Sequence, residues 1–338
     1  MKQWTEKEKK QLIIFVLIAF GMPVLMGIVM GYSYFKGNDV SMFPNAQMYY
    51  PAAGVMLALI FTKEKEEKFP KKYFIGFLAS TMILIIAAFV SVAFPSPEWM
   101  ILGQYPILIL SIVCLILLLI EKKEIRAAYG LKFSGKKGAK SWFYVLLFLV
   151  LYIVRLLITC LVEGQMDMFV NIFTNPMIYI GMFSLVIVFF LSFTAFFGEE
   201  YGWRFFLQPL LQKRFGLKGG VLILGILWGL WHLPINIFFY SPDTWMISVI
   251  LQIVTCISLA IFFGYGYMKT ENIWVPVIMH FINNNMIPLM TGTTDISNQV
   301  YRWVDIPILI LSNLFFIVFI FSKAFKRKEG KELVEDGI

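Results

Sequence analysis

Two histidines and one pair of adjacent glutamates stand out because each lies in or beside a long apolar run. His232 and His280 are the only histidines in 338 residues, and Glu199 and Glu200 directly follow an apolar stretch. Ionisable side chains are costly inside a bilayer and are usually retained there for a function. A carboxylate near histidine suits general-base hydrolysis, in which the carboxylate takes a proton from water and a histidine orients the water or protonates the leaving group. The chemistry of this chain is therefore expected at these residues.

Helical spacing predicts different surroundings for the two glutamates. Glu200 and Arg204 are four residues apart and share a helix face, which favours an ion pair. Glu199 is turned about 100° from Glu200 around the helix and can point elsewhere. We therefore expect Glu200 to be held by Arg204 and Glu199 to be available for chemistry.

Each histidine has a possible partner one helical turn away. Trp228 lies four residues before His232 and can pack against its ring, and Asn284 lies four residues after His280. The side chains of His280 and Asn284 can together donate to the oxyanion of a tetrahedral intermediate, which acyl transfer requires. We find no serine or cysteine placed as a nucleophile, so water is the expected attacker.

The elements that position these residues are expected to be membrane helices. The chain is 59% hydrophobic and 15% charged, unlike a soluble domain, and apolar runs of about 20 residues, enough to cross a bilayer, recur throughout. We predict an all-α fold, a polytopic transmembrane helical bundle of about ten spans. These are Leu12–Tyr32, Met48–Thr62, Tyr73–Phe94, Met100–Ile120, Trp142–Val162, a run from Met177 past Phe197, Gly220–Tyr240, Trp245–Met268, Ile273–Met290 and Ile306–Ser322.

Distances along the helices predict that the polar groups lie at a similar depth. If the helices continue without interruption, Glu199, His232 and His280 lie roughly 17 to 21 Å from basic residues at the predicted cytosolic edge, at about 1.5 Å per residue. The separate apolar runs can therefore place the three groups in one cluster.

The distribution of lysine and arginine predicts the topology. Alternate loops, counted from the N-terminus, carry 26 of the 29 basic residues, and cytoplasmic loops are the ones that retain such residues. Both termini are therefore predicted to be cytoplasmic. This bias accounts for the net charge of +8, so we expect the lipid bilayer and no nucleic acid as a partner. The lysine- and isoleucine-rich style suggests a bacterial cell membrane.

A long basic linker at 121–140 suggests how the chain is divided. We expect an N-terminal accessory bundle of about four spans at 1–140, a catalytic membrane core at 141–322 and a charged cytoplasmic tail at 323–338. The candidate catalytic residues all follow the linker.

At these residues the sequence resembles the CPBP family, the CAAX-protease and bacteriocin-processing intramembrane proteases also called the Abi family. Residues 199–204 (EEYGWR) match the element EExxxR, 228–232 (WGLWH) match FxxxH with tryptophan for phenylalanine, and 280–284 (HFINN) match HxxxN. The elements occur in the family's order on separate spans, and the resemblance covers approximately residues 141–300.

The resemblance implies a role for each matched residue. Glu199 would activate water, His232 would assist, and His280 and Asn284 would form the oxyanion hole, without a metal. Glu200, Arg204 and Trp228 would then be structural support. The substrate would be a membrane-associated peptide or protein whose peptide bond is hydrolysed.

Two other functions stay open at this point. In the first, Glu199, His232 and His280 bind Zn²⁺ in a membrane metalloprotease, since two histidines and a glutamate can form a catalytic zinc site; the usual HExxH element is missing. In the second, the chain is a non-catalytic bacteriocin-immunity or scaffold protein. Each motif taken alone also has a structural explanation, as an ion pair, a buried histidine or a polar contact between membrane helices.

Overall fold

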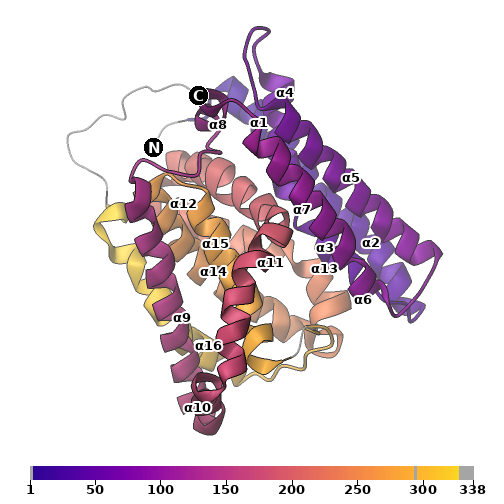
Figure 1. Ribbon diagram of the computed structural model, residues 1–338, viewed down its shortest axis with the longest axis vertical. Coiled ribbons are helices and arrows are strands. Elements are labelled where there is room, and N and C mark those ends of the chain that lie inside the picture. Colours follow the sequence, from indigo (N-terminus) through magenta and orange to yellow (C-terminus); the bar gives the residue numbers. More distant parts are fainter. Residues whose placement is uncertain (1–2, 293–294, 327–338) are drawn as a thin grey trace.

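The computed structural model describes residues 3–292 and 295–326, and within these ranges the regular structure is entirely helical (Figure 1). The α-helices are α1 (Glu6–Ala19), α2 (Gly21–Phe35), α3 (Met42–Gln47), α4 (Tyr50–Thr62), α5 (Lys71–Ala93), α6 (Trp99–Leu102), α7 (Gln104–Leu119), α8 (Lys123–Ala128), α9 (Trp142–Val162), α10 (Met166–Thr174), α11 (Pro176–Glu200), α12 (Gln208–Trp231), α13 (Leu233–Ile235), α14 (Trp245–Thr270), α15 (Trp274–Thr291) and α16 (Asp305–Ile317). The predicted all-α class is confirmed.

Six helical stretches in the described chain are long and apolar enough to cross a membrane: Glu6–Phe35, Lys71–Ala93, Trp99–Leu119, Gly138–Val162, Pro176–Tyr240 and Pro242–Thr270. Two of the predicted spans fall within the single 65-residue stretch Pro176–Tyr240, and the apolar helix Asp305–Phe321 is shorter. The predicted span at 48–62 corresponds to α4, which has only 13 residues. The count of about ten spans and the cytoplasmic placement of the termini stay predictions.

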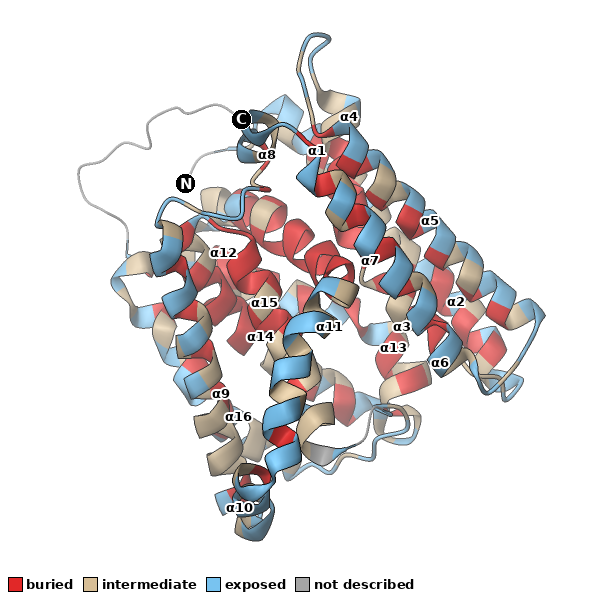
Figure 2. Ribbon diagram, viewed as in Figure 1, coloured by how far each residue is buried: buried red, intermediate tan, exposed pale blue. Residues whose placement is uncertain are grey.

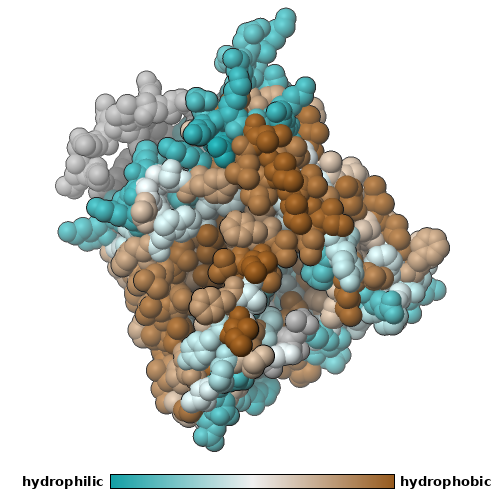
Figure 3. Space-filling model, in the orientation of Figure 1, coloured by the Kyte–Doolittle hydropathy of each residue, from teal (hydrophilic) through white to brown (hydrophobic). Residues whose placement is uncertain are grey.

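The outer surface has the apolar character that lipid requires. Figure 3 shows hydrophobic residues over the middle of the molecule, with hydrophilic residues gathered toward two opposite ends. Buried residues are concentrated along α12, α14 and α15, whereas α10 and much of α11 are exposed (Figure 2). Large apolar side chains such as Phe183 and Ile187 on α11 are exposed by 79% and 66%, which is favourable against hydrocarbon and unfavourable in water. The chain is therefore an integral membrane protein.

The segment that carries both glutamates begins with a well-formed helix cap. Asn175 accepts a hydrogen bond through its side chain from the backbone N–H of Met177 at 2.9 Å, and Pro176 occupies the first turn of α11. Both choices are typical of a helix N-terminus, where backbone N–H groups have no partner within the helix.

The chain does not continue from α11 to His232 as one regular helix. A π-helix at Tyr201–Leu207 follows Glu200 directly, and α12 is broken at Gly216, whose φ of 78° is left-handed. Glycine adopts this conformation at little cost because it has no Cβ. The continuous helix assumed in the depth estimate is therefore wrong.

Glycines let α12 lie directly against α14. A Cβ on Gly225 would lie 2.5 Å from the Cα of Ile257, and one on Gly229 would lie 2.6 Å from the Cα of Ile253. Small residues four apart allow membrane helices to approach closely and gain van der Waals contact. This packing fixes the half of α12 that carries Trp228.

The N-terminal helices pack directly against the glutamate segment. A Cβ on Gly198 would collide with the carbonyl oxygen of Met48, and one on Gly202 would collide with Pro51. The hydroxyl of Tyr49 is 2.6 Å from that of Thr194 on α11. Residues of the predicted accessory bundle at 1–140 thus pack directly against the segment that carries Glu199 and Glu200.

The division at residue 140 stays a prediction. The predicted charged tail at 323–338 begins with a short 3₁₀ turn at Lys323–Phe325. Its residues 327–338 lie outside the described part of the chain.

Candidate functional site

Glu200 is at the centre of a buried ionic cluster. One of its carboxylate oxygens, Oε2, lies 3.1 Å from Nε of Arg204, and the other, Oε1, lies 2.9 Å from Nδ1 of His280. Glu200 and Arg204 are fully buried and His280 is only 4% exposed. The ion pair predicted from the four-residue spacing is confirmed. The link to His280, which is 80 residues away in sequence, comes from packing of α15 against α11.

The guanidinium of Arg204 is enclosed by aromatic rings. It lies 4.5 Å from the ring centroid of Trp228 and 5.3 Å from that of Phe263. A guanidinium is attracted to the negative face of an aromatic ring, more strongly where water is excluded. Nη1 and Nη2 have no hydrogen-bond partner among the described residues, so Glu200 and the rings provide the compensation for this buried charge.

Glu199 has neutral partners instead. Its Oε2 accepts a hydrogen bond from the indole N–H of Trp228 at 2.7 Å and a longer one from that of Trp203 at 3.3 Å. The carboxylate is 2% exposed. Arg204 is thus paired with Glu200, and the hydrogen-bond donors to Glu199 in the described part of the chain are the two indole N–H groups.

His232 is fixed through one ring nitrogen. Its Nδ1 lies 2.8 Å from the backbone oxygen of Trp228. A carbonyl oxygen only accepts, so Nδ1 carries the proton and Nε2 of the neutral ring carries a lone pair. Asn236 braces the same turn, since its side-chain N–H₂ donates to the backbone oxygen of His232 at 2.9 Å and its oxygen accepts from Ser248.

The structure brings most of the predicted residues together around Trp228. Besides the bonds above, the ring of Trp228 lies 5.4 Å from that of His280 and 6.3 Å from that of His232, between centroids. The packing predicted between Trp228 and His232 is thus present, but Trp228 makes a more specific contact with Glu199.

Asn284 lies apart from this group. Its side chain is exposed, and its oxygen accepts a hydrogen bond from Asn283 at 3.0 Å. It follows His280 by one turn on α15, as the spacing predicts. The described contacts of His280 are with Glu200 and aromatic rings, and none joins its imidazole to the Asn284 amide.

Within residues 3–292 and 295–326, no group of three or more histidine, cysteine, aspartate or glutamate side chains is placed to hold a metal ion. Both Nδ1 atoms of the histidines already have partners in Trp228 and Glu200. The side chains proposed for zinc are thus oriented by other contacts in this arrangement.

Two π-helices flank the cluster. One, Tyr201–Leu207, follows the glutamates, and the other, Asn236–Tyr240, begins four residues after His232. Such segments are rare and often occur at functional sites, because their wider turns re-aim neighbouring side chains. Both π-helices thus begin at or near residues of the cluster, directly after Glu200 and at Asn236.

Sequence reasoning missed Trp203 and the donor role of Trp228. Trp203 is four residues after Glu199, so the spacing that indicated the Glu200–Arg204 pair also contained this contact. The bond from Trp228 joins residues 29 apart and depends on how the second half of α12 packs, which spacing along one helix does not specify.

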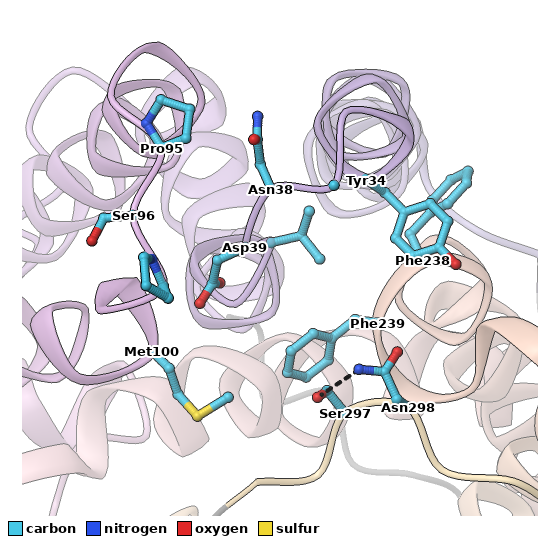
Figure 4. A pocket seen from close by; sticks show the side chains of 13 residues that line it. Tyr34, Asn38, Asp39, Pro95, Ser96, Met100, Phe238, Phe239, Ser297 and Asn298 are labelled. Carbon is cyan, nitrogen blue, oxygen red and sulfur yellow. Dashed lines mark hydrogen bonds between the residues drawn. The ribbon is translucent and has the colours of Figure 1, made fainter.

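A cavity of about 490 Å³ is lined in part by the second π-helix (Figure 4). Its walls come from the loops after α2 and α5, from Phe238 and Phe239, and from Ser297 and Asn298. None of the candidate catalytic residues lines it.

Comparison with protein families gives one match, to the family described as type II CAAX prenyl endopeptidase Rce1-like, over residues 181–286. Comparison with curated proteins and with solved structures found no match. The matched segment covers less than half of the chain and includes Glu199, His232, His280 and Asn284. It points to a protease of the CAAX type. Residues 181–286 are therefore similar to the Rce1-like proteins of the CPBP family.

Proposed function

We propose that this protein is an intramembrane endopeptidase in which Glu199 activates water to hydrolyse a peptide bond of a membrane-associated peptide or protein. The observation that carries the proposal is that two adjacent buried glutamates have different partners. Glu200 is paired with Arg204 and His280, whereas Glu199 has one oxygen bound to indole N–H groups. A carboxylate without its own salt bridge keeps the capacity to accept a proton.

In the proposed reaction, Oε1 of Glu199 removes a proton from water while the water oxygen bonds to the substrate carbonyl carbon. The tetrahedral intermediate then collapses, the C–N bond breaks and the leaving nitrogen receives a proton from Glu199 or through His232. The lone pair on Nε2 of His232 suits it to orient the water or relay that proton.

His280 and Asn284 are proposed as the donors to the oxyanion. With Nδ1 directed at Glu200, His280 donates from Nε2 only when both of its nitrogens are protonated. Asn284, whose amide is exposed and bonded to Asn283, has to turn toward the bound substrate to complete the pair.

The proposed substrate class follows the family description. A CAAX-type endopeptidase acts near the C-terminus of a prenylated protein, so a farnesylated peptide ending in Cys-aliphatic-aliphatic-X is the first probe. The lipid group would partition into the bilayer beside the enzyme. A signal peptide or bacteriocin precursor is the other substrate type to be distinguished.

The test compares membranes from cells that make the wild-type protein, Glu199→Ala or the control Glu163→Ala, by mass spectrometry of new peptide termini. Glu163 is an exposed glutamate at the end of α9. We expect at least one new terminus that wild type and the control produce and Glu199→Ala does not. A set of termini shared by all three would contradict the proposal.

A chelator experiment separates the two hydrolytic mechanisms. The proposed reaction persists when purified protein is assayed in a strong chelator. Loss of cleavage under chelation, with recovery on adding Zn²⁺, would instead support the metalloprotease. A Glu199→Ala protein that preserves the cellular phenotype without cleavage would support the scaffold function.

A further inference from the structure

Trp228 contacts both groups that the proposed reaction uses to move protons. Its indole N–H donates to Oε2 of Glu199 at 2.7 Å, and its backbone oxygen accepts from Nδ1 of His232 at 2.8 Å. The side chain is 2% exposed and lies against the guanidinium of Arg204. One residue thus reaches Glu199 through its side chain and His232 through its main chain.

The side-chain contact distinguishes the two oxygens of Glu199. Trp228 and Trp203 both donate to Oε2. An indole N–H is a donor only, so neither tryptophan competes with the carboxylate for a proton. Oε2 is held in place, and Oε1 is the oxygen left to receive the proton from water.

The main-chain contact distinguishes the two nitrogens of His232. Because the backbone oxygen of Trp228 fixes the proton on Nδ1, Nε2 is the basic position of the neutral ring. This contact depends on the course of α12 and not on the type of side chain at residue 228.

We infer that Trp228 is a positioning residue that selects Oε1 of Glu199 and Nε2 of His232 as the two proton-accepting atoms. The inference rests on the proposed function of Glu199. It also gives a reason for tryptophan at the position where the FxxxH element has phenylalanine, since phenylalanine can provide the ring and the backbone oxygen but not the N–H donor.

The sharpest test replaces Trp228 with β-(3-benzothienyl)alanine in the full chain, by nonsense suppression. This analogue keeps the shape of tryptophan and has sulfur in place of the indole N–H. Trp231 is a matched control, because it is 3% exposed, lies on the same helix and donates its indole N–H to the backbone oxygen of Ala19 at 2.7 Å. Both substitutions remove one buried hydrogen bond of the same length.

Cleavage is measured as the rate at which the Glu199-dependent peptide terminus forms in membranes. We expect the analogue at Trp228 to lower this rate about 10- to 100-fold, the effect of losing a hydrogen bond to a charged group. The analogue at Trp231 should change it by less than about 3-fold, since it keeps the ring beside His232 and its lost bond is to the neutral backbone carbonyl of Ala19. Equal losses at both positions would overturn the inference, because they would indicate a general effect on folding.

A spectroscopic measurement tests the contact without a substrate. Ultraviolet resonance Raman spectra report the strength of hydrogen bonding at indole N–H groups. The difference between wild type and Glu199→Ala should contain a component lost when residue 228 is the analogue and retained when residue 231 is. A difference spectrum unaffected by the analogue at Trp228 would overturn the inference.

The cleavage assay and the Raman measurement together distinguish failure of this inference from failure of the proposed function. If Glu199→Ala still cleaves, the proposed function fails, whatever the Raman result. If Glu199→Ala is inactive but the analogue at Trp228 cleaves at the wild-type rate, the proposed function stands and the positioning role is wrong.

Discussion

Two halves of one buried cluster differ in the groups that bind their carboxylates, which are cationic groups in one half and neutral N–H donors in the other. In the ionic half, Glu200 binds Arg204 and His280, so both of its oxygens face groups that carry or can carry positive charge. In the indole half, Glu199 receives two neutral donors on a single oxygen. The carboxylates are adjacent in sequence and equally shielded from water. Orientation around the helix, and not burial, therefore determines which carboxylate meets the cation and which meets the indole donors.

The ionic half should dominate stability. Replacing Glu200 with glutamine leaves the guanidinium of Arg204 buried without its carboxylate, and breaking a buried pair in this way costs about 3–5 kcal/mol. Unfolding in mixed micelles of increasing SDS content measures the loss. The exposed Glu163→Gln control should change the free energy of unfolding by less than about 0.5 kcal/mol. A loss below about 1 kcal/mol for Glu200→Gln would show that the aromatic rings around Arg204 are sufficient to stabilise its buried charge.

The variant Asn284→Ala tests whether the catalytic site includes a residue outside the ionic and indole halves. If its amide turns to the oxyanion, Asn284→Ala should slow cleavage about 10²- to 10³-fold, which is typical for removal of one oxyanion donor. Stability should change little, because the side chain is exposed. Asn285→Ala is the control, since that amide is bonded to the backbone of its own helix at Phe281. Similar rates for the two variants would remove Asn284 from the mechanism.

Trp203 gives the smallest expected effect within the indole half. Its bond to Glu199 is 3.3 Å long, against 2.7 Å for Trp228, and longer hydrogen bonds are weaker. Trp203→Phe should therefore slow cleavage only about 2- to 10-fold, within the usual contribution of one hydrogen bond. Measured beside Trp228→Phe, a larger effect at Trp203 would reverse the assigned order of the two donors.

Local spacing predicted the parts of this cluster that lie within one helix. The four-residue interval predicted that Glu200 pairs with Arg204. The rotation between adjacent residues predicted that Glu199 points elsewhere. The bonds from His280 to Glu200 and from Trp228 to Glu199 cross 80 and 29 residues. They depend on helix packing, which spacing within one helix does not specify.

The fold was predictable to a similar degree. Long apolar runs gave the all-helical membrane class, because only helices or closed barrels satisfy the backbone in a bilayer. The π-helices and the break at Gly216 were not predicted, since neither changes the apolar pattern. The two spans predicted within the 65-residue stretch Pro176–Tyr240 stay a prediction, because that stretch is one continuous candidate span in the described chain.

The most direct measurement is a comparison of Glu199→Gln and Glu200→Gln, each assayed for cleavage and for free energy of unfolding. We expect Glu199→Gln to keep its stability within about 1 kcal/mol, because the amide oxygen can still accept from the indoles. Its cleavage rate should fall about 10²- to 10⁴-fold, the usual contribution of a general base. Glu200→Gln should lose stability. A Glu199→Gln protein that cleaves at the wild-type rate and unfolds as readily as Glu200→Gln would contradict the assignment of Glu199 as the catalytic base.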